Sequence, residues 1–261
     1  MKAPAFAYAK PRSLDEAFEL LERHGERARL LAGGQSLIPS LNMRLSSPAI
    51  LVDLAALPLR AIVVKGQRVS IGALATHADL ENSAEVRKHV PLLAEAVKHV
   101  AHPAIRNRGT LGGSLALADP AAEYPAVAVA LDATLVLQGR KGERRVQAKD
   151  FFRGLFETAL QPGEIIVAAE FPVAKPGDRS VFLELARRHG DYAIVGLAAH
   201  VGTGAGAEPR FVFMNVGPVP VVANSAAELN PTADLYNSAA TKRHLAGVLM
   251  ERACKTLSIS R

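Results

Sequence analysis

The sequence is poor in cysteine, because Cys254 is the only one in 261 residues. A single thiol cannot form an internal disulfide. It also cannot by itself hold an iron-sulfur cluster or a thiolate zinc site, both of which need several ligands. If this chain works with iron-sulfur clusters, a partner subunit must hold them.

Long apolar runs are missing as well. No stretch of about 18 uninterrupted apolar residues is present, and residues 1–18 have neither the apolar middle nor the small-residue cleavage site of a secretion signal. The sequence therefore predicts no membrane-spanning helix, and the cytoplasm is the expected location.

Several motifs that identify common enzyme classes do not occur. The sequence contains neither the dinucleotide fingerprint G-x-G-x-x-G nor the phosphate loop G-x-x-x-x-G-K-[ST], which disfavours a Rossmann or nucleotide-hydrolase site. It also lacks the metalloprotease motif H-E-x-x-H and the nucleophile elbow G-x-S-x-G. We expect His77, His89, His99 and His102 to be surface or packing residues, and we predict no catalytic residue and no metal ligand.

The composition is that of a folded globular protein. Hydrophobic residues make up 49% of the chain, which is long enough for one large or two modest domains around a substantial core. The net charge of +6 comes from short basic groups such as 140–145 and 187–189. These groups fit a solvated surface, or alternatively a patch for an acidic partner subunit or for the inner membrane face. Nucleic acid is disfavoured, because no aromatic-plus-basic stacking pattern accompanies the charge.

The first 60 residues predict a helix, a strand, a glycine turn, a short helix and a second strand. Ser13 and Glu16 form a capping box, so a helix is expected from Leu14 to about His24, with Gly25 placed to end it. The two strands are expected at 29–32 and 50–54.

Further elements follow from hydrophobic periodicity and turn residues. We expect strands at 61–64, 68–73, 134–138, 144–147, 164–171, 181–187, 193–201 and 210–216, and helices at 91–100, 124–131 and 238–256. The segment 102–114 is expected to be a functional loop. Two prolines and a glycine within 172–178 predict a domain boundary, and hence two α+β domains that meet near residue 175.

Two segments combine a glycine pair with a nearby serine: 32–36 (Ala-Gly-Gly-Gln-Ser) and 110–114 (Thr-Leu-Gly-Gly-Ser). Glycine pairs allow positive φ angles and let successive backbone amides converge on an anion, and a hydroxyl adds a donor. Two such turns that face each other could hold a diphosphate. The alternative for the first segment is a tight strand-to-helix connection. Because the sequence offers no evident acid, base or nucleophile, a bound cofactor is expected to carry the chemistry.

These segments resemble the FAD-binding, or medium, subunits of molybdenum hydroxylases of the carbon monoxide dehydrogenase and xanthine dehydrogenase type. The resemblance rests on 31–37, 105–114 and 119–123, and on the spacing between them. It implies a vanillyl-alcohol-oxidase-like fold. In that fold residues 1–175 form a PCMH-type FAD-binding domain of two α/β subdomains, and residues 176–261 form a smaller C-terminal domain of sheet and helices.

The resemblance also implies which residues bind FAD. Ala101 is expected near the cofactor, Glu123 toward the ribityl chain, and Tyr192 beside the isoalloxazine ring; an ordinary aromatic of a strand-turn core is the alternative for Tyr192. The full set of expected FAD-binding residues is Leu31, Ala32, Gly33, Gly34, Gln35, Ser36, Leu37, Ala101, Thr110, Leu111, Gly112, Gly113, Ser114, Glu123 and Tyr192.

The chain departs from this family at several positions. Glu123 stands where aspartate is usual, Ser114 where asparagine or aspartate is frequent, and Glu184 where some relatives have lysine. The stretch 226–238 is shorter than in relatives, as if a helix were missing.

By resemblance, the partners are a large subunit with the molybdenum cofactor and a small subunit with two two-iron two-sulfur clusters, assembled as a dimer of heterotrimers. Electrons would pass from the clusters to FAD and on to an external acceptor. Two alternatives remain open. One is a free-standing flavin oxidoreductase of the same fold, and the other is a non-catalytic anion-binding or nucleotide-binding module.

Overall fold

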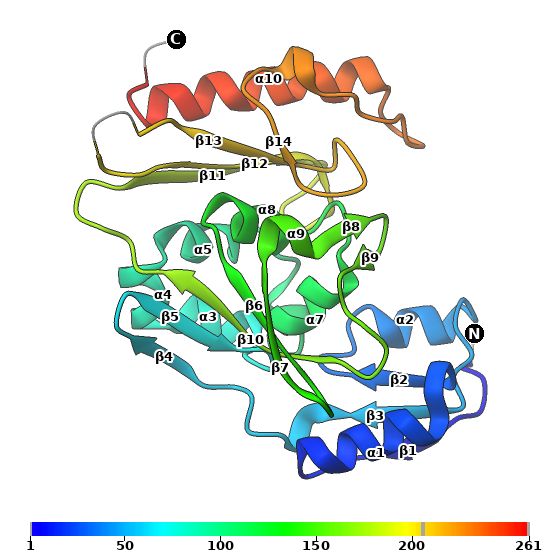
Figure 1. The fold of residues 1–261 in the computed structure, drawn as a ribbon. Helices are drawn as coiled ribbons and strands as arrows, with labels where there is room; N and C mark the ends of the chain where they lie inside the picture. The colour runs from blue at the N-terminus through cyan, green and yellow to red at the C-terminus, as the bar shows by residue number, and fades with distance from the viewer. Residues whose placement is uncertain (1, 205–206, 260–261) are drawn as a thin grey trace.

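The computed structural model of the chain describes residues 2–204 and 207–259. It is a mixed α/β protein, with helices packed around a three-stranded, a five-stranded and a four-stranded sheet and a small hairpin. Figure 1 shows the three-stranded sheet at one end of the molecule and the four-stranded sheet at the other, with the five-stranded sheet between them. Within the described residues, no helix is both long and apolar enough to cross a membrane.

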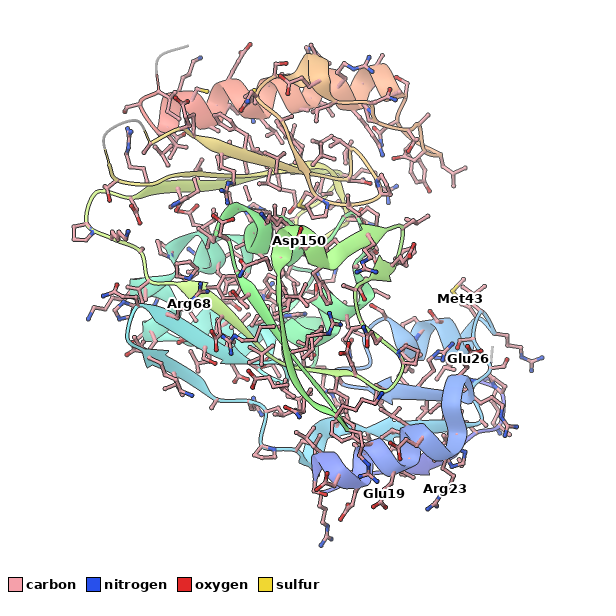
Figure 2. All side chains as sticks on the ribbon, viewed as in Figure 1. Glu19, Arg23, Glu26, Met43, Arg68 and Asp150 are labelled. Atoms are coloured by element: carbon pink, nitrogen blue, oxygen red, sulfur yellow. The ribbon has the colours of Figure 1, made fainter. Side chains whose placement is uncertain are left out.

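The N-terminal sheet is parallel and has the strand order β1-β3-β2. Helix α1 packs on it through Ala17 and Phe18, while Figure 2 shows Glu19 and Arg23 on the outer side of this helix. The elements of this region are β1 (Ala7–Ala9), α1 (Leu14–His24), η1 (Gly25–Arg27), β2 (Ala28–Leu31), α2 (Leu37–Asn42), β3 (Ile50–Asp53) and η2 (Leu54–Ala56).

The capping prediction for α1 is confirmed in most of its detail. Ser13 Oγ accepts a hydrogen bond from the Glu16 amide at 3.2 Å, and Gly25 follows the helix with a positive φ of 52°. The Glu16 carboxylate accepts from the amide of Arg12, at 2.8 Å, and so reaches one residue further back than a capping box requires.

The five-stranded sheet is antiparallel throughout, in the order β4-β5-β10-β6-β7. The predicted hairpin around Gly66 and the strands near 134–147 and 164–171 are confirmed within about two residues. These strands are β4 (Ile62–Lys65), β5 (Arg68–Gly72), β6 (Thr134–Gly139), β7 (Gly142–Gln147) and β10 (Ile165–Pro172); the separate hairpin is β8 (Phe152–Gly154) with β9 (Glu157–Thr158).

Short helices connect and cover these strands. Helix α8 is buried along its whole length, since it lies between the five-stranded and four-stranded sheets. The helices are α3 (His77–Asn82), α4 (Ala84–His89), α5 (Pro91–Ala96), α6 (Pro103–Arg106), α7 (Leu111–Leu117), α8 (Glu123–Ala130) and α9 (Ala148–Phe151).

The C-terminal sheet confirms the predicted antiparallel meander. Figure 1 shows α10 across one face of this sheet and α8 beneath the other. Its elements are β11 (Arg179–Ala186), β12 (Ala193–Val201), β13 (Arg210–Met214), β14 (Val221–Val222), η3 (Ala226–Glu228) and α10 (Ala239–Thr256).

Two sequence predictions were wrong. The segment 102–114 is not a loop throughout, because α6 begins at Pro103 and α7 begins after Thr110, which caps it. The glycines and the proline that suggested a loop occupy helix starts instead, where proline is well tolerated. The predicted helix 91–100 ends as an α-helix at Ala96 and continues only as turns.

The stretch 226–238 contains one 3₁₀ turn, η3, and otherwise irregular chain before α10. An ion pair of 2.9 Å between Asp234 and the buried Lys242 joins this stretch to α10, and the Lys242 ammonium also donates to the Asn215 carbonyl. The Arg187 guanidinium lies 4.5 Å from the ring centroid of Tyr236. These contacts hold this stretch against the C-terminal sheet.

Candidate functional site

A cavity of about 1130 Å³ runs between the N-terminal sheet, the middle of the molecule and the start of the C-terminal sheet. Drug-sized ligands occupy pockets of about 300–1,000 Å³, so this cavity is large enough for an extended ligand. Its walls include 28–30, 32–37, residues of the α6–α7 region and 190–192.

The first glycine segment offers a row of unused donors to the cavity. Gly34 has a φ of +73°, which turns the chain sharply between β2 and α2. Across the described residues, no protein atom accepts a hydrogen bond from the five successive backbone amides of residues 33–37. Gln35 instead donates through its side chain to the Gly33 carbonyl, at 3.0 Å. The segment therefore has the donors that an anion needs.

The second glycine segment is different, because the protein itself uses its amides. The amides of Leu111 and Gly112 donate to the carbonyls of Ala75 and Ala73, at 3.0 and 2.8 Å. The Gly113 amide donates to Thr110 Oγ1 at 3.1 Å, and neither glycine of this pair has a positive φ. The expectation of converging amides is therefore wrong for this segment, although Thr110, Gly112, Gly113 and Ser114 line the cavity.

Gly112 is needed for close packing. A Cβ at this position would lie 2.5 Å from the Ala73 Cβ and 2.8 Å from the Ala73 carbonyl oxygen. The absence of a side chain lets α7 approach the end of β5 and fixes the position of Thr110 and Ser114 at the cavity wall.

The two glycine segments lie against each other. A Cβ on Gly33 would overlap the carbonyl oxygen of Arg108 and lie 2.7 Å from the Gly109 Cα. A Cβ on Gly113 would come within 3.8 Å of the Ala32 Cβ. The fold therefore brings both segments to one cavity, but only the first offers free amides.

Ala101 has a left-handed backbone, with a φ of 45°, which is unfavourable for a residue with a side chain. The buried Arg106 holds it there by donating to the carbonyls of Val100 and Ala101, at 3.1 and 3.0 Å. Glu81 accepts two further bonds from the same guanidinium, at 2.9 and 3.2 Å. Arg106 thus fixes the chain where it lines the cavity.

The turn between β11 and β12 contributes Tyr192, which lines the cavity and is 71% exposed. Gly190 has a φ of +76°, and a Cβ there would lie 2.6 Å from the Ala101 carbonyl oxygen. This close approach sets the Tyr192 turn directly beside Ala101.

Glu123 lies at the start of α8, buried at the inner wall of the cavity. Burial, together with the charge of Asp119, raises the pKa of its carboxyl group to about 7. Glu123 is therefore partly protonated near neutral pH.

Of the fifteen residues predicted to bind a cofactor, thirteen line this cavity, and two do not. Leu111, the first residue of α7, is fully buried, and Leu31 is the last residue of β2. Among the described residues, no group of three His, Cys, Asp or Glu side chains is arranged to hold a metal ion.

Sequence reasoning missed part of the cavity wall. His77 is buried there, with Nδ1 3.0 Å from the Tyr124 hydroxyl, and burial, together with the charge of Arg106, lowers its pKa to about 4. Phe156, at the turn of the β8–β9 hairpin, and Leu45, after α2, also line the cavity. No local motif marks these residues, because only the tertiary fold brings them to the cavity.

Comparisons with known proteins agree on one family. A family described as "FAD binding domain in molybdopterin dehydrogenase" matches residues 4–174. The 6-hydroxypseudooxynicotine dehydrogenase complex subunit alpha of Paenarthrobacter nicotinovorans is 46% identical over 202 residues, which are 77% of this chain and 68% of that protein. The carbon monoxide dehydrogenase medium chain of Hydrogenophaga pseudoflava is 35% identical over an alignment that covers 97% of each of the two proteins.

A solved structure gives the same result. The carbon monoxide dehydrogenase from Hydrogenophaga pseudoflava, in a form that lacks the Mo-pyranopterin moiety of its cofactor, contains a chain that superimposes on this one with a TM-score of 0.95. The identity is 35%, and 99% of each chain is covered.

Proposed function

Because this chain belongs to the family of FAD-binding domains of molybdopterin dehydrogenases, we propose that it is the electron-transfer subunit of a molybdenum hydroxylase complex. FAD is the cofactor of this family, and the relatives are subunits of dehydrogenases. In this role the chain takes electrons from iron-sulfur clusters of a partner and passes them to an external acceptor.

One observation carries the proposal: the row of five unused amides at 33–37, which faces a cavity large enough for a dinucleotide. These amides, with the hydroxyls of Thr110 and Ser114, match the acceptors of a diphosphate. The Gly33 position supports the fit, since a Cβ there would push apart the two segments that form this wall.

We assign FAD binding to the residues of the two glycine segments and to three residues at the ring end of the cavity. Ala101 and Glu123 lie on the wall toward the flavin and its ribityl chain, and Tyr192 contacts the ring. The segment residues assigned to FAD are Ala32, Gly33, Gly34, Gln35, Ser36 and Leu37 from the first, and Thr110, Gly112, Gly113 and Ser114 from the second. Leu31 and Leu111 adjoin these residues without lining the cavity.

Bound FAD supplies the conversion between one-electron and two-electron transfer. The chain's own residues bind and orient it: the amides and hydroxyls hold the diphosphate, and Arg106 fixes Ala101. With Cys254 as its one thiol, the chain depends on a small subunit for iron-sulfur clusters and on a large subunit for the molybdenum cofactor and the substrate. We infer a dimer of such heterotrimers in the cytoplasm.

The finer architecture is also a proposal. We assign the three-stranded and five-stranded sheets to two α/β subdomains of a vanillyl-alcohol-oxidase-like, PCMH-type domain at residues 1–175. Residues 176–261 would then be the C-terminal domain. The separate core between the four-stranded sheet and α10 supports this division.

The electron-transfer role predicts that the isolated, FAD-loaded chain bleaches when it is mixed with the pre-reduced small subunit. It should not turn over with organic donors by itself, because those donors would bind the large subunit. Stopped-flow absorbance of the flavin measures both reactions. Sustained turnover of the isolated chain with a small-molecule donor would contradict the proposal and favour a free-standing flavin oxidoreductase.

The assignment of Tyr192 to the ring has its own test. Tyr192→Ala should raise the fluorescence of bound FAD and weaken FAD binding by up to about tenfold, because an aromatic stack is worth about 0.5–1.5 kcal/mol. Tyr192→Phe is the matched control and should retain both properties. If the alanine variant behaves like the wild type in both measurements, Tyr192 is an ordinary exposed aromatic residue.

A further inference from the structure

Asn215 directly follows β13 and has a left-handed backbone, with a φ of +58°. Asparagine is one of the few residues with a side chain that adopt this conformation readily, because its short amide can hydrogen-bond to nearby backbone groups. The pairing of β12 with β13 ends just before it, at Gly196 and Met214. Beyond that pair, β13 supplies no ladder hydrogen bonds to the start of β12, whose carbonyls need another donor.

The side chain of Asn215 is that donor. Its Nδ2 donates to the carbonyl of Ala193 at 2.6 Å and to the carbonyl of Ile194 at 3.2 Å. Ile194 is skipped in the pairing of β11 with β12, which marks a β-bulge. Bulges change the direction of neighbouring side chains and are frequent next to active sites. Because Tyr192 directly precedes Ala193, Asn215 holds the chain at the point where the Tyr192 turn joins the sheet.

The backbone amide of Asn215 connects the same point to a second segment of the cavity wall. It donates to the carbonyl of Pro120, at 2.8 Å. On either side of Pro120, residues 119 and 121–123 line the cavity, as do residues 190–192 of the Tyr192 turn. Asn215 itself does not line the cavity. It therefore joins two segments of the wall from outside the cavity.

The Tyr192 turn also has ion pairs of its own, but these are exposed. Arg187 and Arg188 lie 3.2 and 3.8 Å from the Asp191 carboxylate, and at least half of each arginine side chain is exposed. Pairs of this kind contribute little, because water and salt screen them. Both side-chain bonds of Asn215 are partly buried, so they fix the turn more firmly than these ion pairs do.

We propose that Asn215 is a positioning residue for FAD: it fixes the Tyr192 turn relative to the segment 119–123. This inference rests on the proposed function, in which Tyr192 contacts the flavin ring and Glu123 lies toward the ribityl chain. Because Asn215 does not line the cavity, it acts through Tyr192. The buried Lys242 donates to the Asn215 carbonyl at 3.4 Å, so α10 is joined to the same point.

The first test needs no cofactor. Asn215→Gly removes the side-chain amide, keeps the backbone donor to Pro120 and tolerates the positive φ. In the FAD-free chain, amide hydrogen exchange of residues 187–195 should become several-fold faster, because local opening of the turn is easier without the two bonds. Asn82→Gly is the matched control, since its amide also donates to a backbone carbonyl, that of Ala78 at 2.8 Å, but at the exposed end of α3. This control should leave the exchange of 187–195 unchanged.

FAD binding gives a readout that a purely structural role would not change. Asn215→Gly should raise the fluorescence of bound FAD and weaken FAD binding by up to about tenfold, which is the effect expected of Tyr192→Ala, because both changes remove the aromatic contact with the ring. In the Tyr192→Ala background, Asn215→Gly should change neither property further, since the two residues act as one unit. Asn82→Gly should leave both properties as in the wild type.

The outcomes separate the two proposals. Additive effects of Asn215→Gly and Tyr192→Ala on FAD binding, or unchanged exchange of 187–195 in Asn215→Gly, would overturn the positioning role even if FAD binds. Failure of the wild-type chain to bind FAD would overturn the proposed function, while the exchange experiment still decides whether Asn215 holds the turn. If Asn215→Gly does not fold, Asn215→Asp keeps the shape and tolerates the left-handed backbone, but its carboxylate cannot donate to the two carbonyls, so the same results are expected.

Discussion

Gly33→Ala is expected to weaken FAD binding by about 10- to 100-fold. The new Cβ would overlap the Arg108 carbonyl oxygen and lie 2.7 Å from the Gly109 Cα, and both neighbours are backbone atoms that cannot turn away. Overpacking of this kind costs about 1–3 kcal/mol, and each 1.4 kcal/mol is tenfold in affinity. The two segments that face the diphosphate must move apart, so the amides of 33–37 lose their alignment.

Titration of the FAD-free chain with FAD, followed by quenching of flavin fluorescence, measures this effect. Gly247→Ala, in the middle of α10, is the matched control, since its Cβ would lie 3.5 Å from the Ala226 Cβ and should raise stability by about 0.5–1 kcal/mol. FAD affinity should not change in this control. Full flavin occupancy in the double variant Gly33→Ala/Gly112→Ala would contradict the assignment of FAD binding to the two segments.

Arg106→Met is expected to destabilise the protein by about 3 kcal/mol. The change leaves the Glu81 carboxylate without its partner and removes both bonds that hold the Val100 and Ala101 carbonyls. The cost lies at the lower end of the range for a broken buried pair, because about a third of the Glu81 side chain is exposed. The melting temperature should fall by roughly 6–12 °C.

FAD affinity should fall in the same variant, because Ala101 loses the contacts that hold its left-handed backbone. Arg60→Met is the control for loss of an arginine: Arg60 is 64% exposed, and its ion pair with Asp79 is worth less than about 1 kcal/mol. The double variant Arg106→Met/Glu81→Met should recover part of the lost stability. A melting temperature of Arg106→Met equal to that of Arg60→Met would show that the buried pair does not hold this wall.

The elements with strong local signals could be predicted from the sequence. Helix α1 has a capping serine at its start and a glycine at its end, and both act as expected. Strand β1 could not be predicted, because Ala7–Ala9 is too short to show alternation and is held by parallel pairing with Ile50–Val52, far along the chain. Helices α6 and α7 were not predicted, because proline and glycine near the start of a helix give the same sequence pattern as they do in a loop.

The hydrogen bonding of the candidate site was also beyond prediction from the sequence. The two glycine segments have nearly the same residues, yet only 33–37 leaves its amides free. The difference arises because the carbonyls of Ala73 and Ala75 lie beside the start of α7 and accept hydrogen bonds from its amides. No sequence motif indicates this tertiary contact.

The most direct test of the account is to purify the chain, remove any bound chromophore, and titrate it with FAD while the visible spectrum and stoichiometry are recorded. The account predicts an oxidised-flavin spectrum, one FAD bound per chain, and release of intact FAD on denaturation. A colourless chain that does not take up added FAD would contradict the central claim and favour an anion-binding module.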